Sequence, residues 1–330
     1  MHSQDPLLDI QNLSTFFHTE ENIVRSVRNV DLTIYPGETV ALVGESGCGK
    51  SVTALSAMRL VPMPPGNFEN GRILFKEKDL LQASELEMQK IRGNEIGMIF
   101  QEPMTSLNPI FTIGDQIIEA ICLHQDKSHD EARILALKVL KKVAMPSPET
   151  RIDQYPHELS GGMKQRVMIA MSIACKPSLL IADEPTTALD VTIQAQILDL
   201  LDELRKETQM SILLITHNLG IVAQYADRVA VMYSGKIVEL ASVENIFASP
   251  SHPYTKGLLN SLPKDTISVK LETIPGAVPH PAFLPEGCAF HPRCAEKMGE
   301  CEREIPELQS LDSNPKHQTA CWLYNKTPAL

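Results

Sequence analysis

A glycine-rich stretch, Gly44-Glu-Ser-Gly-Cys-Gly-Lys50-Ser51, most constrains what this chain can fold into. It matches the pattern G-x-x-x-x-G-K-[ST], which binds nucleoside phosphates when it follows a strand and opens a helix. The apolar run Thr39–Val43 predicts that strand, and we expect the helix to begin near Gly49. A glycine-rich turn arising by chance would not explain both the Lys-Ser pair and this context. The stretch therefore predicts a phosphate loop and, on its own, only a nucleoside triphosphatase.

The side chains of this loop suit a Mg²⁺-bound nucleotide. Lys50 is expected to reach the β- and γ-phosphates, and the Ser51 hydroxyl is expected to ligate Mg²⁺. Cys48 lies near Lys50 and a helix N-terminus, which both lower a thiol pKa, but a small tolerated spacer is the favoured interpretation. The predicted nucleotide-binding residues here are Gly44, Ser46, Gly47, Cys48, Gly49, Lys50, Ser51 and Val52.

A second constellation narrows the chemistry. Leu179–Ala182 predicts a buried strand that ends in Asp183 and Glu184, and such strands deliver carboxylates to the ligand-binding edge of a sheet. Asp183 is expected to hold Mg²⁺, and Glu184 is expected to polarise the attacking water. Before this strand, small residues that open a helix predict a second anion site, which hints at pairing between chains. These residues are Ser160, Gly161 and Gly162.

Alternating strands and helices predict an α/β fold with a mostly parallel, covered sheet. Ser128 and Glu131 predict a capping box. The helix that follows should bury Ile134, Leu135, Val139 and Val143, and a second helix should bury Ile197 and its apolar neighbours. Further strands are expected at Leu8–Leu13, Val27–Ile34 and Ile212–Ile215.

Composition excludes several classes. The net charge of −11 and an aromatic content of 5% argue against nucleic-acid binding. No apolar run approaches the ~20 residues that cross a bilayer, and the N-terminus has no signal-peptide pattern, so we expect a cytosolic protein. The 7 cysteines are irregularly spaced and do not suggest a disulfide framework.

The composition changes after about residue 264, where prolines interrupt regular structure and four cysteines follow with the spacing C-x5-C-x6-C-x19-C. Four thiolates can hold a zinc ion or a four-iron four-sulfur cluster, and the lack of a C-x2–4-C knuckle favours the cluster; no metal is the third possibility. We expect His291 and His317 to be bystanders. So short an extension has little apolar core, and ligation would supply folding energy. The candidate ligands are Cys288, Cys294, Cys301 and Cys321.

Motifs along residues 6–263 occur in the order of one family. Gln101 follows Phe100, Ala188-Leu189-Asp190 follows the Asp-Glu pair, and His217 follows a predicted strand. With the phosphate loop and Leu159–Met163, they resemble the nucleotide-binding subunit of an ATP-binding cassette (ABC) transporter. The resemblance implies a RecA-like P-loop core with an antiparallel β lobe, and a helical subdomain at about 104–165.

The same resemblance implies two such domains that meet head to tail, each ATP lying between one phosphate loop and the other chain's Ser-Gly-Gly loop. It implies that Gln101 senses Mg²⁺ and the attacking water, His217 contacts the γ-phosphate and Asp190 crosses the dimer interface. Phe17 is then expected to stack on adenine, with Phe16 as the alternative.

Longer stretches, Gln101–Pro109, Asp183–Thr192 and Ser251–Leu259, resemble the ATPases of dipeptide/oligopeptide (and nickel) permeases. The extension resembles that of the same group, in which it can carry an iron–sulfur cluster. The resemblance implies a peripheral ATPase at the cytoplasmic face of the cell membrane. Its implied partners are a second homologous ATPase subunit, two transmembrane permease subunits and an extracytoplasmic solute-binding protein.

The domains expected are a nucleotide-binding domain at 1–263 and a Pro/Cys-rich extension at 264–330. Peptide import is the leading function, with nickel or another small solute as the alternative. A soluble ABC ATPase acting on ribosomes or DNA is disfavoured because the chain has one phosphate loop and no long heptad run. A nucleotide-binding metal sensor is disfavoured because Glu184 and His217 are both present.

Overall fold

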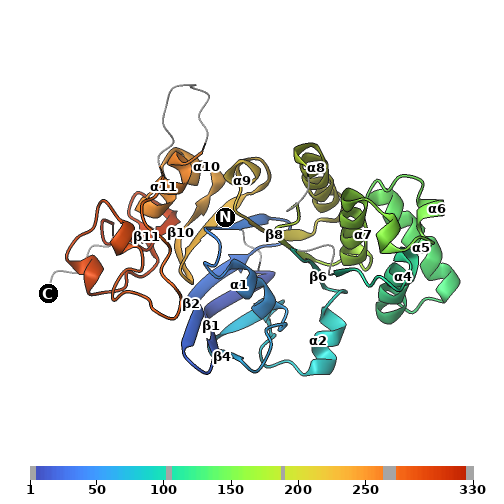
Figure 1. Cartoon of the computed structure of the whole chain (residues 1–330), viewed down its shortest axis with the longest axis horizontal. Coiled ribbons are helices and arrows are strands. Elements are labelled where there is room, and N and C mark those ends of the chain that lie inside the picture. Colours follow the sequence, from blue (N-terminus) through green and yellow to red (C-terminus); the bar gives the residue numbers. More distant parts are fainter. Residues whose placement is uncertain (1–4, 102–105, 187–189, 263–272, 325–330) are drawn as a thin grey trace. The chain divides into compact units, whose positions relative to one another are not determined.

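The computed structural model describes residues 5–101, 106–186, 190–262 and 273–324, which form two compact units (Figure 1). Unit 1 contains the described residues of Met1–Leu7, Ile34–Glu38 and Gln82–Ile215. Unit 2 contains those of Leu8–Thr33, Thr39–Leu81 and Thr216–Leu330. The phosphate loop and the C-terminal segment (residues 273–324) therefore belong to the same unit.

Three parallel strands form the sheet of unit 1. Ala182 lies opposite Ile99, and Asp183 lies opposite Ile215, so the carboxyl ends of these strands share one edge. Every residue of the second and third strands is buried, as expected for parallel strands covered on both faces. In the order in which they pair, the strands are β6 (Ile96–Ile99), β7 (Leu179–Asp183) and β8 (Ser211–Thr216).

Helices make up most of the rest of unit 1, and α5 packs against α4 and α7 (Figure 1). The capping box predicted at Ser128 and Glu131 is confirmed at the start of α5. Val143 is buried as predicted. The predicted inward face is wrong for Ile134, which is 56% exposed, because the buried face of α5 consists of Ala132, Ala136 and Leu140. The helices are α2 (Glu85–Ile91), α4 (Ile113–His124), α5 (His129–Lys142), α6 (Pro148–Arg151), η1 (Pro156–Glu158), α7 (Gly161–Ile173) and α8 (Val191–Thr208).

Unit 2 contains an antiparallel lobe and part of a second sheet. In the lobe the strand order is β2-β1-β4-β5, and Thr15 of β1 contacts Ser56 of α1 with 2.9 Å between their hydroxyl oxygens. The four strands are β1 (Leu8–His18), β2 (Ile23–Ile34), β4 (Gly66–Phe75) and β5 (Lys78–Asp79), and the helix is α1 (Lys50–Ala57). The strands and the helix predicted in this region are confirmed, although β1 extends five residues further than expected.

The second sheet of unit 2 joins the strand before the phosphate loop to the C-terminal strands. β3 (Thr39–Val43) pairs in parallel with β9 (Arg228–Tyr233), which forms a hairpin with β10 (Lys236–Ser242). Glu239 of β10 lies opposite Thr319 of β12 (Asn314–Thr319), and β12 pairs with β11 (Gln309–Leu311). The C-terminal segment thus extends the sheet that carries the phosphate loop.

The C-terminal segment also contributes to the core of unit 2. Phe290 is buried among Tyr233, Tyr254 and Val43, so the segment, which we expected to have little apolar core of its own, packs on the core of the body. The remaining elements are α9 (Leu219–Tyr225), α10 (Val243–Ala248), α11 (Pro253–Asn260), η2 (His291–Arg293) and η3 (Glu300–Glu302).

Within the described part of the chain, no helix combines the length and apolarity that crossing a bilayer requires. The expected boundary between residues 263 and 264 lies at the edge of residues 263–272, outside the described ranges, and stays a prediction.

Candidate active site

The phosphate loop requires glycine at two positions. Gly44 has φ +154°, and a Cβ there would lie 2.2 Å from the carbonyl oxygen of Met232. Gly49 has φ +109°, and a Cβ there would lie 2.3 Å from the carbonyl oxygen of Ser26. Neither position can accept a side chain without moving the backbone beside it. The loop is therefore fitted closely against β9 and β2.

Lys50 lies inside the curve of this loop. Its Nζ donates to the carbonyl oxygens of Gly44 (2.8 Å) and Glu45 (3.0 Å), and the residue is buried. Ser46 and Gly47 are exposed at the tip. In the first turn of α1, Ser51 and Val52 are half-buried. A buried ammonium group inside a loop of small residues suits an anion such as a nucleoside phosphate.

Cys48 is fully buried in the same loop, with its Sγ 3.7 Å from Nζ of Lys50. Burial raises the pKa of the Cys48 thiol, and the nearby Lys50 charge does not reverse this. A thiol with a raised pKa is mostly protonated at neutral pH and reacts slowly with oxidants. Burial and a raised pKa support the interpretation of Cys48 as a small packed spacer.

His217 lies close to the phosphate loop within unit 2. It lines a cavity of about 90 Å³ together with Val43, Gly44 and Glu45. The residue is exposed and directly precedes Asn218, whose side chain accepts hydrogen bonds from the first N–H groups of α9. The structure thus brings His217 and the phosphate loop together. The N-cap hydrogen bonds of Asn218 hold the backbone next to His217 in place.

Phe17 and Phe16 lie on opposite faces of β1, because successive side chains of a strand alternate. Phe17 shares a face with Thr15, which contacts α1 through Ser56. On the other face, Phe16 lies under the guanidinium of Arg25, at 5.9 Å from the ring centre. Of the two aromatic residues, Phe17 is therefore the one on the side of the helix that begins at the phosphate loop.

In unit 1, Gln101 and Glu184 lie together at the carboxyl edge of the parallel strands. Gln101 Nε2 donates to Glu184 Oε2 at 3.4 Å. Glu184 has φ +46°, and its N–H donates to the carbonyl oxygen of Ile215 at 2.9 Å. This left-handed conformation costs a non-glycine residue about 1–2 kcal/mol. Such a cost is typical of functional sites, where the surrounding structure holds a side chain in place.

The predicted second anion site opens α7. Ser160 caps the helix by accepting a hydrogen bond from the N–H of Met163 at 3.4 Å, and Ser160 and Gly161 are exposed while Gly162 is partly covered. Asp190 caps α8 in the same way, through the N–H of Ile193 at 2.9 Å, and is exposed. Ala188 and Leu189 lie outside the described residues.

Gln165 is a residue of this region that the sequence analysis missed. Its side chain is buried and donates to the carbonyl oxygen of Pro185, directly after Glu184. It therefore links α7 to the turn that carries the carboxylates. A polar residue on the apolar side of a predicted helix was the available signal, because buried polar groups need a partner.

The four C-terminal cysteines line one small cavity, which His291 also lines. Burial raises the pKa of Cys288 and Cys294, and it raises that of Cys321 to about 12. However, among the described residues no group of three or more His, Cys, Asp or Glu side chains is arranged to hold a metal ion. His317 pairs instead with Glu239, at 2.6 Å.

Comparisons with known proteins first define the class. Residues 27–187 match the family model "ABC transporter". The solved ATP-binding cassette MJ0796, a dimer bound to ADP and phosphate, is 27% identical with a TM-score of 0.65, covering 72% of this chain and 98% of that one. Clostridium perfringens cbiO1, part of an ABC transporter complex, is 29% identical with a TM-score of 0.63, covering 74% and 92%. The fold is that of an ABC ATPase cassette.

The family follows from more similar relatives. Residues 238–301 match the model "Oligopeptide/dipeptide transporter, C-terminal region". The dipeptide transport ATP-binding protein DppD of Bacillus subtilis is 51% identical, covering 98% of this chain and 96% of that protein. The oligopeptide transport ATP-binding protein AppD of the same organism is also 51% identical, covering 98% of both. The chain belongs to the ATP-binding proteins of oligopeptide/dipeptide ABC transporters.

Proposed function

We propose that this chain is the ATP-hydrolysing subunit that energises import of di- and oligopeptides across the cytoplasmic membrane. The observation that carries the proposal is the likeness to peptide transport ATP-binding proteins over almost the whole chain, including the C-terminal region. Nickel or another small solute is less well supported, because the similar relatives are named for peptides. The same likeness disfavours a soluble, non-transport ABC ATPase.

In this proposal the residues of unit 2 bind the nucleotide. Lys50 holds the β- and γ-phosphates, Ser51 contributes to Mg²⁺ binding, and Phe17 stacks on adenine. His217 contacts the γ-phosphate. The burial of Lys50 within the loop and the cavity shared by His217 and Gly44 support these roles.

The residues of unit 1 prepare the water that attacks the γ-phosphate. Asp183 binds Mg²⁺, Glu184 orients and polarises the attacking water, and Gln101 senses both. The hydrogen bond between Gln101 and Glu184 and the left-handed backbone of Glu184 support this assignment.

We further propose that each ATP binds between two ATPase subunits, the second being a homologous chain. Ser160, Gly161 and Gly162 would then contact the nucleotide held by the partner's phosphate loop, and Asp190 would cross the interface. The exposure of Ser160 and Asp190 at helix N-termini supports this. Mixing the Lys50→Ala variant with a Ser160→Arg variant should restore one active site in each mixed dimer, which contains one chain of each variant. Full turnover by a protein that light scattering finds monomeric would contradict it.

The complete transporter would also contain two transmembrane permease subunits and an extracytoplasmic solute-binding protein, and this chain would be peripheral at the cytoplasmic face. Purification of the intact complex, with mass spectrometry of the solute on its binding protein, tests the assignment. Peptides and peptide-stimulated ATP hydrolysis are expected, whereas nickel with no effect of peptides would overturn it.

Finally, we propose that Cys288, Cys294, Cys301 and Cys321 hold an iron–sulfur cluster with four irons. Their shared cavity supports this, as do Arg28 and Lys236, which line an adjoining cavity with Cys288 and carry charge that suits a negative centre. Zinc is less well supported, because the C-x2–4-C knuckle that is usual in structural zinc sites is absent from the spacing of these cysteines. When bound, the cluster would join the four cysteines to one another and so stabilise the folded segment.

A further inference from the structure

Arg293 of the C-terminal segment forms a two-pronged ion pair with Glu45 of the phosphate loop. Its Nη1 lies 2.7 Å from Glu45 Oε2, and its Nη2 lies 3.1 Å from Oε1. Its Nε donates to the carbonyl oxygen of Pro275 at 2.9 Å, so the guanidinium is oriented at both ends. The Arg293 side chain is 5% exposed and that of Glu45 is 30% exposed. This geometry gives stronger and more directional contacts than a surface pair.

Glu45 in turn contacts the lysine of the loop. Its N–H donates to the hydroxyl of Tyr254 at 2.9 Å, and its carbonyl oxygen accepts from Nζ of Lys50 at 3.0 Å. The carboxylate, the N–H and the carbonyl oxygen of Glu45 therefore each form a polar contact. If the Glu45 carboxylate moved, the carbonyl oxygen that accepts from Lys50 would move with it, because both belong to the same residue.

The stretch of chain that carries Arg293 is firmly attached to the body. Phe290 packs edge-on against Tyr233, with 5.2 Å between ring centres, and lies 5.5 Å from the Tyr254 ring. Tyr233 also accepts from Arg293 Nη1 at 3.4 Å. Arg293 thus contacts Glu45 from a stretch of chain, between Cys288 and Cys294, that is packed against the body.

Charge gives the pair a second effect. The loop is suited to phosphate groups, and an unpaired carboxylate within it would repel them. Arg293 neutralises that carboxylate from outside the loop and leaves Lys50 available for the nucleotide.

We propose that Arg293 is a positioning residue for ATP, which holds the phosphate loop through Glu45 and so makes ATP affinity depend on the C-terminal segment. The inference rests on the proposed role of this loop as the ATP site. It assigns the C-terminal segment a regulatory influence on that site, in addition to any ligand the cysteines hold.

Equilibrium binding of radiolabelled ATP with Mg²⁺ to the full-length chain tests this. Arg293→Gln should raise Kd about tenfold with an unchanged number of sites per chain. Arg293→Lys keeps the charge but loses the two-pronged geometry, and should raise Kd about threefold. Glu45→Gln combined with Arg293→Gln should bind more tightly than Arg293→Gln alone, because no carboxylate is left unpaired. Lys297→Gln, which removes an exposed cation paired with Glu302 in the same segment, should leave Kd unchanged.

Two outcomes would overturn the inference: an unchanged Kd in Arg293→Gln, or fewer sites with an unchanged Kd, which indicates a folding role only. The Lys50→Ala variant examines the underlying assumption separately. Normal ATP binding by Lys50→Ala would contradict the assignment of this loop as the ATP site. If Lys50→Ala lost ATP binding but Arg293→Gln kept the native Kd, only the role of Arg293 would be refuted.

Discussion

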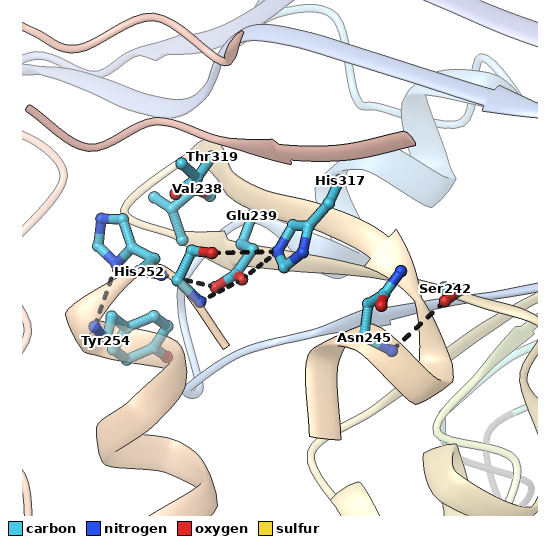
Figure 2. Close-up of polar contacts among 9 residues, drawn as sticks. Val238, Glu239, Ser242, Asn245, His252, Tyr254, His317 and Thr319 are labelled. Atoms are coloured by element: carbon cyan, nitrogen blue, oxygen red, sulfur yellow. Dashed lines mark hydrogen bonds and ion pairs between the residues drawn. The ribbon is translucent and has the colours of Figure 1, made fainter. Parts of the chain in front are cut away.

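The carboxylate of Glu239 and the imidazole of His317 form a buried pair, with 2.6 Å between Oε1 and Nε2 (Figure 2). The same carboxylate accepts the N–H groups of Ser251 at 2.7 Å and of His252 at 2.9 Å, just before α11. Burial alone would raise the pKa of Glu239, but these hydrogen bonds outweigh it and lower that pKa. One side chain of β10 therefore joins the C-terminal strand β12 and helix α11 to the sheet.

Replacing Glu239 by Gln should strongly destabilise unit 2. The change leaves a buried imidazole and two N–H groups with a poorer partner, which costs about 3 kcal/mol. Urea unfolding at pH 7, followed by tryptophan fluorescence, measures it. Because the folded-state pKa is lowered, this stabilisation is present above the unfolded-state pKa of about 4.3 and is lost as pH falls through the folded-state value. The difference from the native chain should therefore shrink below about pH 4. Glu302→Gln, which removes an exposed ion pair with Lys297, is the control. An equal loss of stability in Glu302→Gln would contradict the stabilising role of the buried Glu239 carboxylate.

His252→Asn should flatten the pH dependence of stability. Burial lowers the pKa of His252 to about 4, despite the nearby Glu239. Between about pH 6.5 and 4 the unfolded chain binds a proton that the folded chain does not, so stability falls as pH falls, by up to about 1.4 kcal/mol per unit. Asn keeps the acceptor for the N–H of Tyr254 at this helix N-cap and does not titrate.

Urea midpoints at pH 7, 6 and 5 measure this effect. His280→Asn is the matched control, because exposed His280 accepts the N–H of Ala282 in the same way. That variant should keep the native slope. If His252→Asn also kept it, His252 would not be the buried neutral group that the geometry indicates.

The elements closest to the phosphate loop could be predicted because their signals are local. Thr39–Val43 is an unbroken apolar run and became β3, and Gly44 and Gly49 occupy positions that only glycine tolerates. The buried face of α5 was predicted less well, since Ile134 is the more apolar residue but Ala136 allows closer helix packing. Which of two faces packs depends on neighbouring helices, and periodicity alone does not contain that information.

In the candidate active site, too, residues marked by local patterns could be predicted, and contacts between distant residues could not. The sequence predicts Glu184 from the strand before it, but not its left-handed backbone or its contact with Gln101, 83 residues away. Arg293 and Glu45 are separated by 248 residues, and neither belongs to a pattern that marks the other as a partner. Burial of Phe290 beside Tyr233 creates that contact, so it follows from tertiary packing and not from any local signal.

Glu184→Gln should retain ATP binding and lose hydrolysis by at least about 100-fold. The amide preserves the shape of the side chain but cannot accept the proton of the attacking water. Measurement of ATP binding and of phosphate release by the same preparation separates the two effects. Glu203→Gln, which alters an exposed side chain of α8, is the control and should hydrolyse ATP normally. Hydrolysis by Glu184→Gln within about twofold of the native chain would sink the assignment of this carboxylate.

Cys301→Ser should remove the proposed cluster while leaving the ATP site formed. Cys301 is buried, its Sγ accepts the N–H of Met298 at 3.4 Å, and its carbonyl oxygen accepts the N–H of Cys288 at 2.8 Å. Native chain purified without oxygen should be brown and contain about four iron and four sulfide per chain. The variant should be colourless, and its C-terminal segment should be cut faster by protease because ligation no longer supports it.

The controls for this variant are Cys122→Ser and Cys175→Ser, which alter cysteines outside the shared cavity. Both should keep the colour and the iron of the native chain. One equivalent of zinc in a colourless native preparation would replace the cluster by a structural zinc site. A native chain without metal would contradict both assignments, and the packing of Phe290 and the Glu239–His317 pair would then hold the segment without ligation.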